Sequence, residues 1–308
     1  MSTVGIIQAM SSLMLRLITL NLGGGVKNFM GSPEQSAAKI EAINTLINQV
    51  KPDLLACQEI AQYIDADGNM HSMVDQIRDG SGFDQAYYGE TLSIKKHMQI
   101  KKDVMIRAIF NDWWDWSKGN ALFTRVPFCR LSDPTKGGVP RNVPIFQPIV
   151  YEGSRNTDPR YVILSRLKIA PYPYVLNLHL STLTGERGEN AWQDAIDAAQ
   201  STRQQQMARI LGLIEEAVLQ EKKPVIMLGD FNAQPDEYCL KGMLEEEKSF
   251  VRLKPVPDLE THGSAGQLDH IFFSPRERLI SYKAQVVDNK LTRSLSDHLP
   301  VVADLEIE

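Results

Sequence analysis

Residues 224–236, PVIMLGDFNAQPD, constrain the fold of this chain more than any other stretch. The apolar run 225–228 is typical of a buried strand, and it ends at Gly229, directly before Asp230 and Asn232. Residues two apart in extended backbone point to the same side, so we expect both polar side chains to project together. A carboxylate can take a proton from water, and an amide can donate to a phosphate oxygen without adding negative charge. Asp-Xaa-Asn also occurs in ordinary turns, so the rest of the chain must decide between a turn and a catalytic site.

The bulk composition is that of a globular protein. The chain has 308 residues, 43% hydrophobic and 23% charged. That length allows two domains, but there is no internal repeat and no low-complexity linker, so we expect one domain over residues 14–308. Residues 1–13 precede the first convincing strand and are interpreted as an N-terminal extension that makes a poor signal peptide. No segment has the length of apolar residues that a membrane span requires.

Charge and cysteine content narrow the expected partners and compartment. The net charge of -5 gives no overall basic surface, so a nucleic acid would have to be bound by a local patch and by metal. Cys57, Cys129 and Cys239 are an odd number without metal-ligand spacing, which fits a reducing compartment. We therefore expect a cytoplasmic protein, and we expect it to be a monomer.

The order of elements predicts two packed sheets with helices on the outside. Strands are expected at 15–22, 54–59, 120–124, 145–151, 161–169, 174–181, 225–231, 268–274, 280–287 and 301–307. A long helix is expected between residues 190 and 219 and a short one near Asp236. Two stretches are interpreted as insertions on this frame, residues 61–119 and the polar loop 183–190.

Many of the expected strands begin or end in a polar residue that can serve phosphate or metal chemistry. These residues are Asn21, Glu59, Asn120, His179, Asp230, Asn232, Asp269, Asp297 and His298. Hydrophobic strands that repeatedly finish in Asn, Glu, His or Asp predict a shared polar rim above a β core.

With these motifs the sequence resembles the endonuclease/exonuclease/phosphatase superfamily, whose members include DNase I, abasic-site endonucleases, sphingomyelinases, deadenylases and inositol polyphosphate 5-phosphatases. The motifs occur in the family's order over about residues 14–306: Leu20-Asn21, Gln58-Glu59, Gly119-Asn120-Ala121, His179-Leu180, Gly229-Asp-Phe-Asn232, Leu268-Asp269 and Ser296-Asp297-His298. The resemblance implies a four-layered α/β sandwich of the DNase I type.

The resemblance also implies a Mg²⁺ (or Mn²⁺) site. Glu59 would be the main ligand, a hard oxygen donor for a hard cation, and Asn21 and Asp297 would complete or support the shell. Asn120 would contact the substrate, and Arg187 in the polar loop is a further candidate for a phosphate contact.

The remaining motif residues would carry the reaction, an in-line attack of water on phosphorus. Asp230 would orient and deprotonate the water, and Asn232 would hold the phosphate. His298 would donate to a phosphate oxygen, supported by Asp269 on its other ring nitrogen. His179 would act on the phosphate or on the leaving oxygen.

Two positions depart from the abasic-site endonuclease pattern. Gly23 stands where those enzymes usually carry an Asp, and His270 stands where an aromatic residue is frequent. Together with His179, these positions favour the sphingomyelinase-like and deadenylase-like branch and put a second metal in doubt.

Three functions are open at this point. We expect first a metal-dependent phosphodiesterase that acts on nucleic acid. The alternatives are a sphingomyelinase-like, phosphoinositide-directed or small-molecule phosphoesterase, and a non-catalytic binding module on the same fold. The binding module is disfavoured because every position that the chemistry needs holds a residue able to perform it.

Two features lie outside the motifs. His262 is expected to be a surface residue. The Trp113–Trp116 cluster could contact bases or lipid, or pack the insertion onto the sandwich.

Overall fold

Two mixed β-sheets pack face to face in the computed structural model, which describes residues 12–23, 33–65, 67–97, 99–111, 113–244, 249–263 and 265–308. The first sheet has the order β12-β13-β1-β2-β5-β4, with β3 paired to β2, and the second has the order β10-β11-β9-β8-β7-β6. The strands of the first sheet are β1 (Leu13–Asn21), β2 (Leu54–Ile64), β3 (Met70–Ser72), β4 (Gln85–Ser93), β5 (Ser117–Thr124), β12 (Leu279–Val286) and β13 (Val301–Ile307). Those of the second are β6 (Arg141–Phe146), β7 (Arg160–Arg166), β8 (Tyr174–His179), β9 (Val225–Asp230), β10 (Val251–Arg252) and β11 (Asp269–Ser274).

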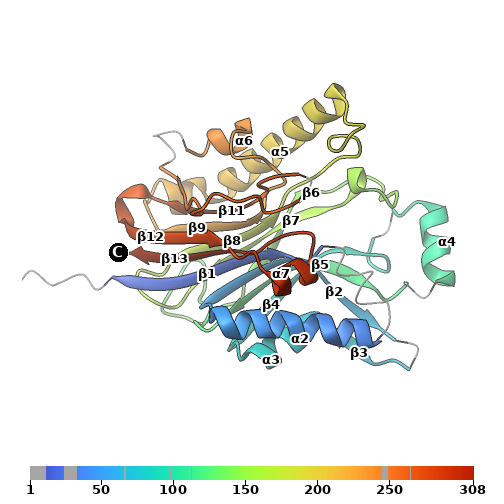
Figure 1. The fold of residues 1–308 in the computed structure, drawn as a ribbon, viewed down its shortest axis with the longest axis horizontal. Coiled ribbons are helices and arrows are strands. Elements are labelled where there is room, and N and C mark those ends of the chain that lie inside the picture. The colour runs from blue at the N-terminus through green and yellow to red at the C-terminus, as the bar shows by residue number, and fades with distance from the viewer. Residues whose placement is uncertain are drawn as a thin grey trace, which may run out of the picture.

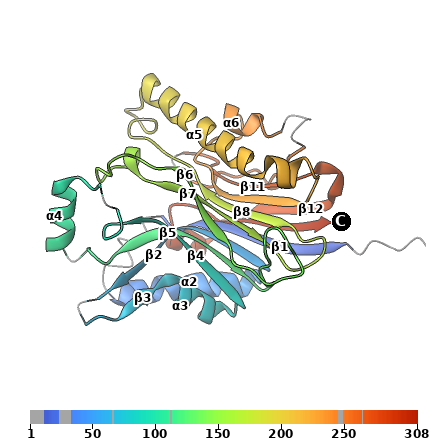
Figure 2. The same cartoon turned by 180° about the vertical axis from the view of Figure 1, so that it is seen from behind.

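Helices cover the outer face of each sheet, as Figures 1 and 2 show from opposite sides. On the first sheet lie α2 (Pro33–Val50), α3 (Met73–Ser81) and α7 (Lys290–Leu295), and on the second lie α5 (Gln193–Ile214) and α6 (Tyr238–Lys241). A further helix, α4 (Lys102–Phe110), projects from one end of the sandwich.

Three apolar layers hold this arrangement together. One, with Leu17, Ala56 and Leu228, lies between the two sheets. Another joins the first sheet to α2 and α3, and the third joins the second sheet to α5 and α6. Helix, sheet, sheet and helix are therefore successive layers, and the prediction of a four-layered α/β sandwich is confirmed.

Parallel strand pairs bring the polar strand ends to one edge. β1 runs parallel to β2, and β8 runs parallel to β9 with His179 opposite Asp230. β11 enters antiparallel to β9, which sets Asp269 opposite Asp230. The two sheets meet at this edge through the hydrogen bond from Asn21 Nδ2 to Asp230 Oδ2, 2.8 Å. The common edge follows from the strand directions.

Several predicted boundaries were wrong: the strand expected at 54–59 extends to Ile64, and the one expected at 161–169 ends at Arg166. The strand expected at 145–151 is β6 at Arg141–Phe146, and residues 147–150 lie outside any strand. The stretch 61–119 is an insertion only in part, because it contains β3, α3 and β4, and β4 pairs with β5 along its whole length. β4 gave no clear sequence signal because most of its first residues are half-buried, so its apolar and polar residues do not alternate.

The long helix expected between residues 190 and 219 is α5, followed by a π-helical turn at Glu215–Leu219. Among the described residues, no helix is both long enough and apolar enough to cross a membrane. The expected N-terminal extension 1–13 falls mostly outside the described residues, and β1 begins at Leu13.

Candidate active site

Asp230 is the last residue of β9, and its backbone is fixed by the strands on both sides. Gly229 precedes it at a φ of 147°, and a Cβ at this position would lie 2.0 Å from the carbonyl oxygen of Leu178 in β8. Only glycine permits this close approach, so the sequence Gly-Asp is a packing requirement as well as a chemical one. The strand therefore presents the Asp230 carboxylate at a fixed place on the shared edge.

The Asp230 carboxylate is buried and surrounded by donors. Its Oδ1 accepts from the backbone N–H of Asn232 at 2.8 Å, and its Oδ2 accepts from Asn21 Nδ2 at 2.8 Å and from Asn232 Nδ2 at 3.3 Å. His179 Nε2 and His298 Nε2 lie 3.4 and 3.9 Å from the same Oδ2. Burial raises the pKa of Asp230, and the nearby His298 opposes that rise. The result is an oriented carboxylate whose proton affinity is higher than that of an exposed aspartate.

His298 forms a buried pair with Asp269. Its Nδ1 lies 2.8 Å from Asp269 Oδ2, and its Nε2 faces Asp230. Burial alone would lower the pKa of His298, but the carboxylates of Asp269 and Asp230 raise it to about 10. The imidazolium is thus the stable form at neutral pH, as the sequence predicted for a phosphate donor.

His179 lies on the other side of Asp230 and has a cation as its partner. Arg160 Nη1 is 3.0 Å from His179 Nδ1, and since a guanidinium only donates, this ring nitrogen must accept. Burial, together with the charges of Arg160 and Lys118, holds the pKa of His179 well below its ordinary value. His179 is therefore neutral, with its proton on Nε2, pointing toward Asp230. Arg160 itself is a contact that the sequence analysis did not identify.

Asn232 is saturated by contacts within the protein. Its Nδ2 donates to the Leu180 carbonyl oxygen at 3.0 Å as well as to Asp230, and its Oδ1 accepts from Arg187 Nη1 at 2.8 Å. It has a φ of 49°, so its backbone turns sharply after the strand. In this arrangement Asn232 orients Asp230 and Arg187.

The polar loop 183–190 is fixed to α5 by a buried ion-pair network. Arg203 donates to Glu186 at 2.7 Å and to Glu237 at 2.7 and 3.0 Å. Because Glu186 is adjacent to Arg187, the network fixes the guanidinium that reaches Asn232. The sequence predicted the loop and Arg187, but it gave no signal for the charges beneath it.

Glu59 reaches the site from an irregular position in β2. The pairing of β2 with β5 shifts register between Cys57 and Ile60, and Glu59 has a φ of 55°. A bulge of this kind changes the direction of a side chain that regular pleating would send elsewhere. Glu59 then lines a small cavity together with Thr91, Lys118, Gly119, Asn120, Arg160 and His179. Asn120 is buried there and donates to the Tyr161 carbonyl oxygen at 3.3 Å.

The carboxylates of Glu59 and Asp297 both lie near the ammonium group of Lys39. The ammonium of Lys39 in α2 donates to the Leu22 carbonyl oxygen at 2.8 Å. Burial lowers the pKa of Lys39, while Asp297 and Glu59 both raise it, so both carboxylates lie near its charge. The donors in this region, carboxylates with the Asn21 amide oxygen, are hard oxygen ligands. Donors of this type can bind a hard divalent cation.

Gly23 makes the position of Asp297 possible. Its φ is 47°, and a Cβ there would lie 2.0 Å from Asp297 Oδ1 and 2.6 Å from Ser296 Oγ. A side chain at position 23 would therefore meet the ends of the Asp297 and Ser296 side chains, which would have to move to make room for it. Ser296 Oγ also donates to the Asn21 carbonyl oxygen at 2.7 Å, which ties the two segments together.

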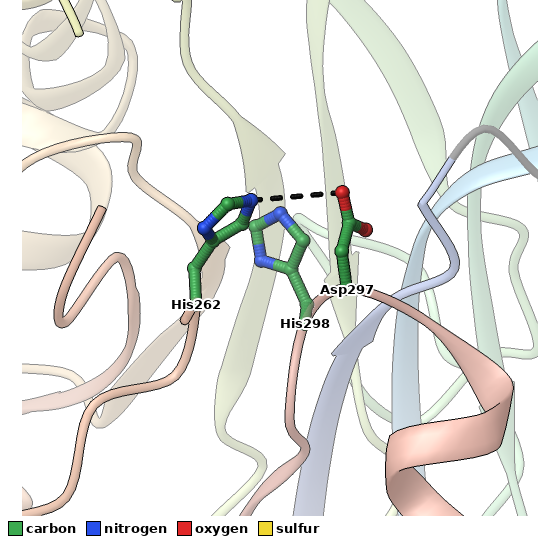
Figure 3. Close-up of side chains that lie close together, drawn as sticks. All are labelled: His262, Asp297 and His298. Carbon is green, nitrogen blue, oxygen red and sulfur yellow. Dashed lines mark ion pairs between the residues drawn. The ribbon is translucent and has the colours of Figure 1, made fainter. Parts of the chain in front are cut away.

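His262 is a residue whose placement the sequence analysis got wrong. It is half-buried and pairs by backbone with His298, and the two rings meet edge to face with centroids 4.7 Å apart (Figure 3). Its Nε2 lies 3.6 Å from Asp297 Oδ2, and this contact holds the pKa of Asp297 well below its usual range. A ligand atom from each of these three residues lies within 4.8 Å of the others. A lone histidine in a loop carries no sequence signal for such a contact.

The remaining histidines make other contacts. His270 is buried in the wall, where its Nε2 lies 2.9 Å from the Ala233 carbonyl oxygen. Burial and the charge of Arg252 lower the pKa of His270 to about 4. His71 lies 2.7 Å from Asp65 beside the β2–β3 turn, and His97 Nδ1 contacts the backbone of Ser93. The structure thus brings the sequence-predicted residues to one edge and adds Arg160, Lys118, Lys39 and His262.

Comparison with solved structures shows the same fold in distant proteins. An endonuclease/exonuclease/phosphatase from Beutenbergia cavernae is 17% identical, with a TM-score of 0.62, over 96% of this chain and 72% of that one. One from Bacteroides vulgatus is 14% identical, with a TM-score of 0.64, over 96% and 100%. TDP2 from C. elegans is 15% identical, with a TM-score of 0.56, over 95% and 75%.

Two comparisons used the sequence alone. No curated protein sequence matches the chain. The family model described as Endonuclease/Exonuclease/phosphatase family matches residues 18–298, which include every predicted site residue. The motifs, the four layers and this match lead to one conclusion: the chain belongs to the endonuclease/exonuclease/phosphatase family.

Proposed function

We propose that this protein hydrolyses phosphodiester bonds by in-line attack of water, with nucleic acid as its substrate. Members of the family are generally hydrolases of phosphoester bonds. The observation that carries the proposal is the Asp230 carboxylate, buried and oriented between a neutral and a charged imidazole.

Asp230 is the general base of this proposal. Two amide groups hold its oxygens, and burial raises its pKa toward the range in which a carboxylate can accept a proton from water. Asn21 and Asn232 are positioning residues here, since their amide protons already point at Asp230 or at backbone.

The two histidines supply donors to the phosphate. His298, charged through Asp269, would place an N–H bearing full positive charge against the oxygen on which negative charge develops. His179 would add a neutral Nε2–H, because Arg160 occupies its other nitrogen. Since His179 cannot accept a proton on Nε2 in this tautomer, proton abstraction is left to Asp230.

Glu59, Asp297 and Asn21 would hold the divalent cation. When bound, Mg²⁺ or Mn²⁺ would polarise a phosphate oxygen and offset the charge of the transition state. Arg187, Lys118 and Arg160 lie around the same edge. Asp158 offsets part of their positive charge, and the remainder favours a polyanionic substrate.

Nucleic acid is favoured as the substrate by two points. The basic groups lie in and beside the cavity that contains Glu59 and His179, where neighbouring phosphates of a strand would pass. The solved structures with the same fold include TDP2 from C. elegans and a humanised TDP2 from D. rerio, at 15% and 14% identity.

A substrate panel with and without metal tests the proposal. Plasmid DNA, single-stranded DNA, RNA, sphingomyelin, inositol phosphates and bis-p-nitrophenyl phosphate are incubated with Mg²⁺ or Mn²⁺. Hydrolysis of a nucleic acid that EDTA abolishes and added metal restores is the expected result. Glu59→Gln should raise the metal concentration needed for half-maximal rate. Full activity in EDTA would refute the metal assignment, and turnover of sphingomyelin alone would refute the substrate class.

A further inference from the structure

Helix α4 carries an apolar stripe that faces solvent. The side chains of Ile106, Ile109 and Phe110 are 44%, 49% and 82% exposed, and Trp113 in the following turn is 47% exposed. The first three are spaced i, i+3, i+4 and so lie on one side of the helix. Trp113 is tied to the helix end by its backbone N–H, which donates to the Ala108 carbonyl oxygen at 2.8 Å. The protein itself leaves this stripe uncovered among the residues that the structure describes.

The opposite side of α4 is already used by the fold. Val104 and Ala108 are buried against Ile94 and Ile100, and Met105, Trp114, Trp116 and Tyr151 pack around this cluster. Lys101 N–H donates to the Tyr151 carbonyl oxygen at 3.1 Å. The helix is therefore apolar on two opposite sides, and its packed side holds the exposed stripe in place. A helix stabilised only by its packed side needs polar residues on the other.

Basic side chains surround the stripe. The segment 94–116 contains five basic residues and three acidic ones, whereas the whole chain has 33 basic and 38 acidic residues. The side chains of Lys95, Lys96 and Lys101 are 59%, 70% and 52% exposed, and they lie 2.8, 3.0 and 4.0 Å from the carboxylates of Asp115, Glu90 and Asp103. Lys102 lies four residues before Ile106 and so on the same side as the stripe. Exposed ion pairs of this kind are weak, so the lysines can exchange these partners for acidic headgroups, and the small positive excess of the segment complements an anionic surface.

The segment leaves the sandwich at the same end as the active site. It connects Ser93 of β4 to Ser117 of β5, which pair with each other, and Ser117 also pairs with Gln62 at the far end of β2. Glu59 in β2 and Lys118 in β5 line the active-site cavity. A surface bound by α4 would therefore lie near the catalytic edge (Figure 1).

We propose that α4 docks this protein on an anionic lipid membrane, with the stripe in the headgroup region and the lysines against acidic headgroups. An interfacial helix combines an apolar face with basic residues in this way. Isoleucine favours lipid over single-stranded nucleic acid, because bases stack on aromatic faces and gain little from branched aliphatic chains. Nine residues of helix bury too little area for a stable dimer, which needs roughly 1,200 Å² or more.

Co-sedimentation of the full chain with vesicles tests this proposal without any substrate. Wild-type protein should bind phosphatidylcholine vesicles that contain phosphatidylglycerol, bind pure phosphatidylcholine weakly, and detach as salt is raised. Phe110→Ser with Ile109→Ser should lower the partition coefficient by about tenfold or more, because burial of apolar side chains supplies much of the binding. The matched control is Ile149→Ser, which removes an 85% exposed isoleucine outside α4 and should bind like the wild type.

Hydrolysis of bis-p-nitrophenyl phosphate is followed in parallel, so that docking and catalysis are judged separately. Loss of vesicle binding with hydrolysis unchanged supports the docking role, whether or not nucleic acid is the substrate. Three results would overturn it: no binding of wild type to anionic vesicles, equal binding of the double variant, or a wild-type dimer in light scattering that the double variant breaks. A variant that loses affinity for single-stranded DNA and keeps vesicle binding would overturn it as well.

Discussion

The two sides of Asp230 carry the same side chain in opposite electrical settings. His179 and His298 are both buried, and both direct Nε2 toward Asp230. Burial lowers the pKa of both rings; Arg160 on the outer nitrogen lowers that of His179 further, whereas Asp269 on the outer nitrogen and Asp230 raise that of His298. Two equally buried imidazoles thus differ in protonation state because the outer partner of one is a cation and that of the other is an anion. The two imidazoles can therefore make different contributions at one pH.

The largest effect is expected when the Asp230 carboxylate, which lies between the His179 and His298 rings, is removed. Asp230→Asn keeps the shape of the side chain but cannot take a proton, so kcat should fall by ~10²–10⁴-fold with KM little changed. Burial raises the pKa of Asp230, so its negative charge opposes folding, and the neutral variant should melt at the same or a higher temperature. Steady-state kinetics and thermal melts at pH 7 measure both. Near-normal turnover at saturating metal and substrate would exclude Asp230 as the base.

The next prediction concerns His298, the charged imidazole, which Asp269→Asn should convert to the neutral form at a lower pH. Removing the carboxylate lowers the pKa of His298 from about 10, so the alkaline limb of the pH–rate profile should move to lower pH. We expect kcat to fall by roughly 10–10²-fold at pH 8 and less at pH 6. The wild-type pair stabilises the fold fully below the unfolded histidine pKa, near ~6.5, and loses this contribution as pH rises through about 10. The variant should therefore lose melting temperature below neutral pH and little at high pH.

A double variant separates a working pair from two independent residues. Asp269→Asn combined with His298→Gln should cost clearly less than the sum of the single losses, because either change alone disables the imidazolium. Additive losses would mean that Asp269 does not act through His298.

A further prediction concerns His179, the neutral imidazole, whose Nδ1 would lose its cationic partner in Arg160→Gln. Loss of the cation should raise the pKa of His179 toward its ordinary value and free the tautomer, with kcat/KM lowered by roughly tenfold. Nitrogen-15 NMR of the imidazole reports both changes. Arg166→Gln is the matched control, since Arg166 is a buried arginine at the other end of β7 and donates to the carbonyl oxygens of Tyr172 and Leu131. A kinetic loss with unchanged His179 signals would mean that Arg160 acts on the substrate directly.

The smallest expected effect concerns His262, which contacts both His298 and Asp297. His262→Gln should weaken the support of Asp297 and raise the metal concentration for half-maximal rate by roughly two- to fivefold, as for a partly exposed ion pair. The control is His71→Gln, which removes a similar histidine–aspartate contact outside the site. Identical metal titrations for wild type and His262→Gln would show that Asp297 needs no support from this ring.

The fold could be predicted from the sequence wherever a strand carries a continuous apolar run or a clear alternation. Val225–Asp230 has such a run, Val301–Ile307 alternates apolar and acidic residues in its second half, and neither pattern needs knowledge of the neighbouring strands. β4 could not be predicted, because it lies at a sheet edge and its Tyr87 and Tyr88 are half-buried on both faces. Its role depends on pairing with β5, which no local pattern records.

In the site, residues within short motifs could be predicted, and residues placed by long-range contacts could not. Asp230 and Asn232 define each other within three positions of the chain. Arg160 becomes informative only because β7 and β8 are paired, and Lys39 only because α2 covers the first sheet near Leu22. An arginine at a strand start and a lysine in a helix are ordinarily solvent-exposed, so their burial is a property of the fold.

The missing side chain at Gly23 links two positions, Gly23 and Asp297, that are far apart in the chain but adjacent in space. A Cβ at position 23 would meet the end of the Asp297 side chain first, so Asp297 would have to move to make room for it. Bulk added beside β1 would therefore act on the site through the placement of a carboxylate that belongs to the C-terminal part of the chain.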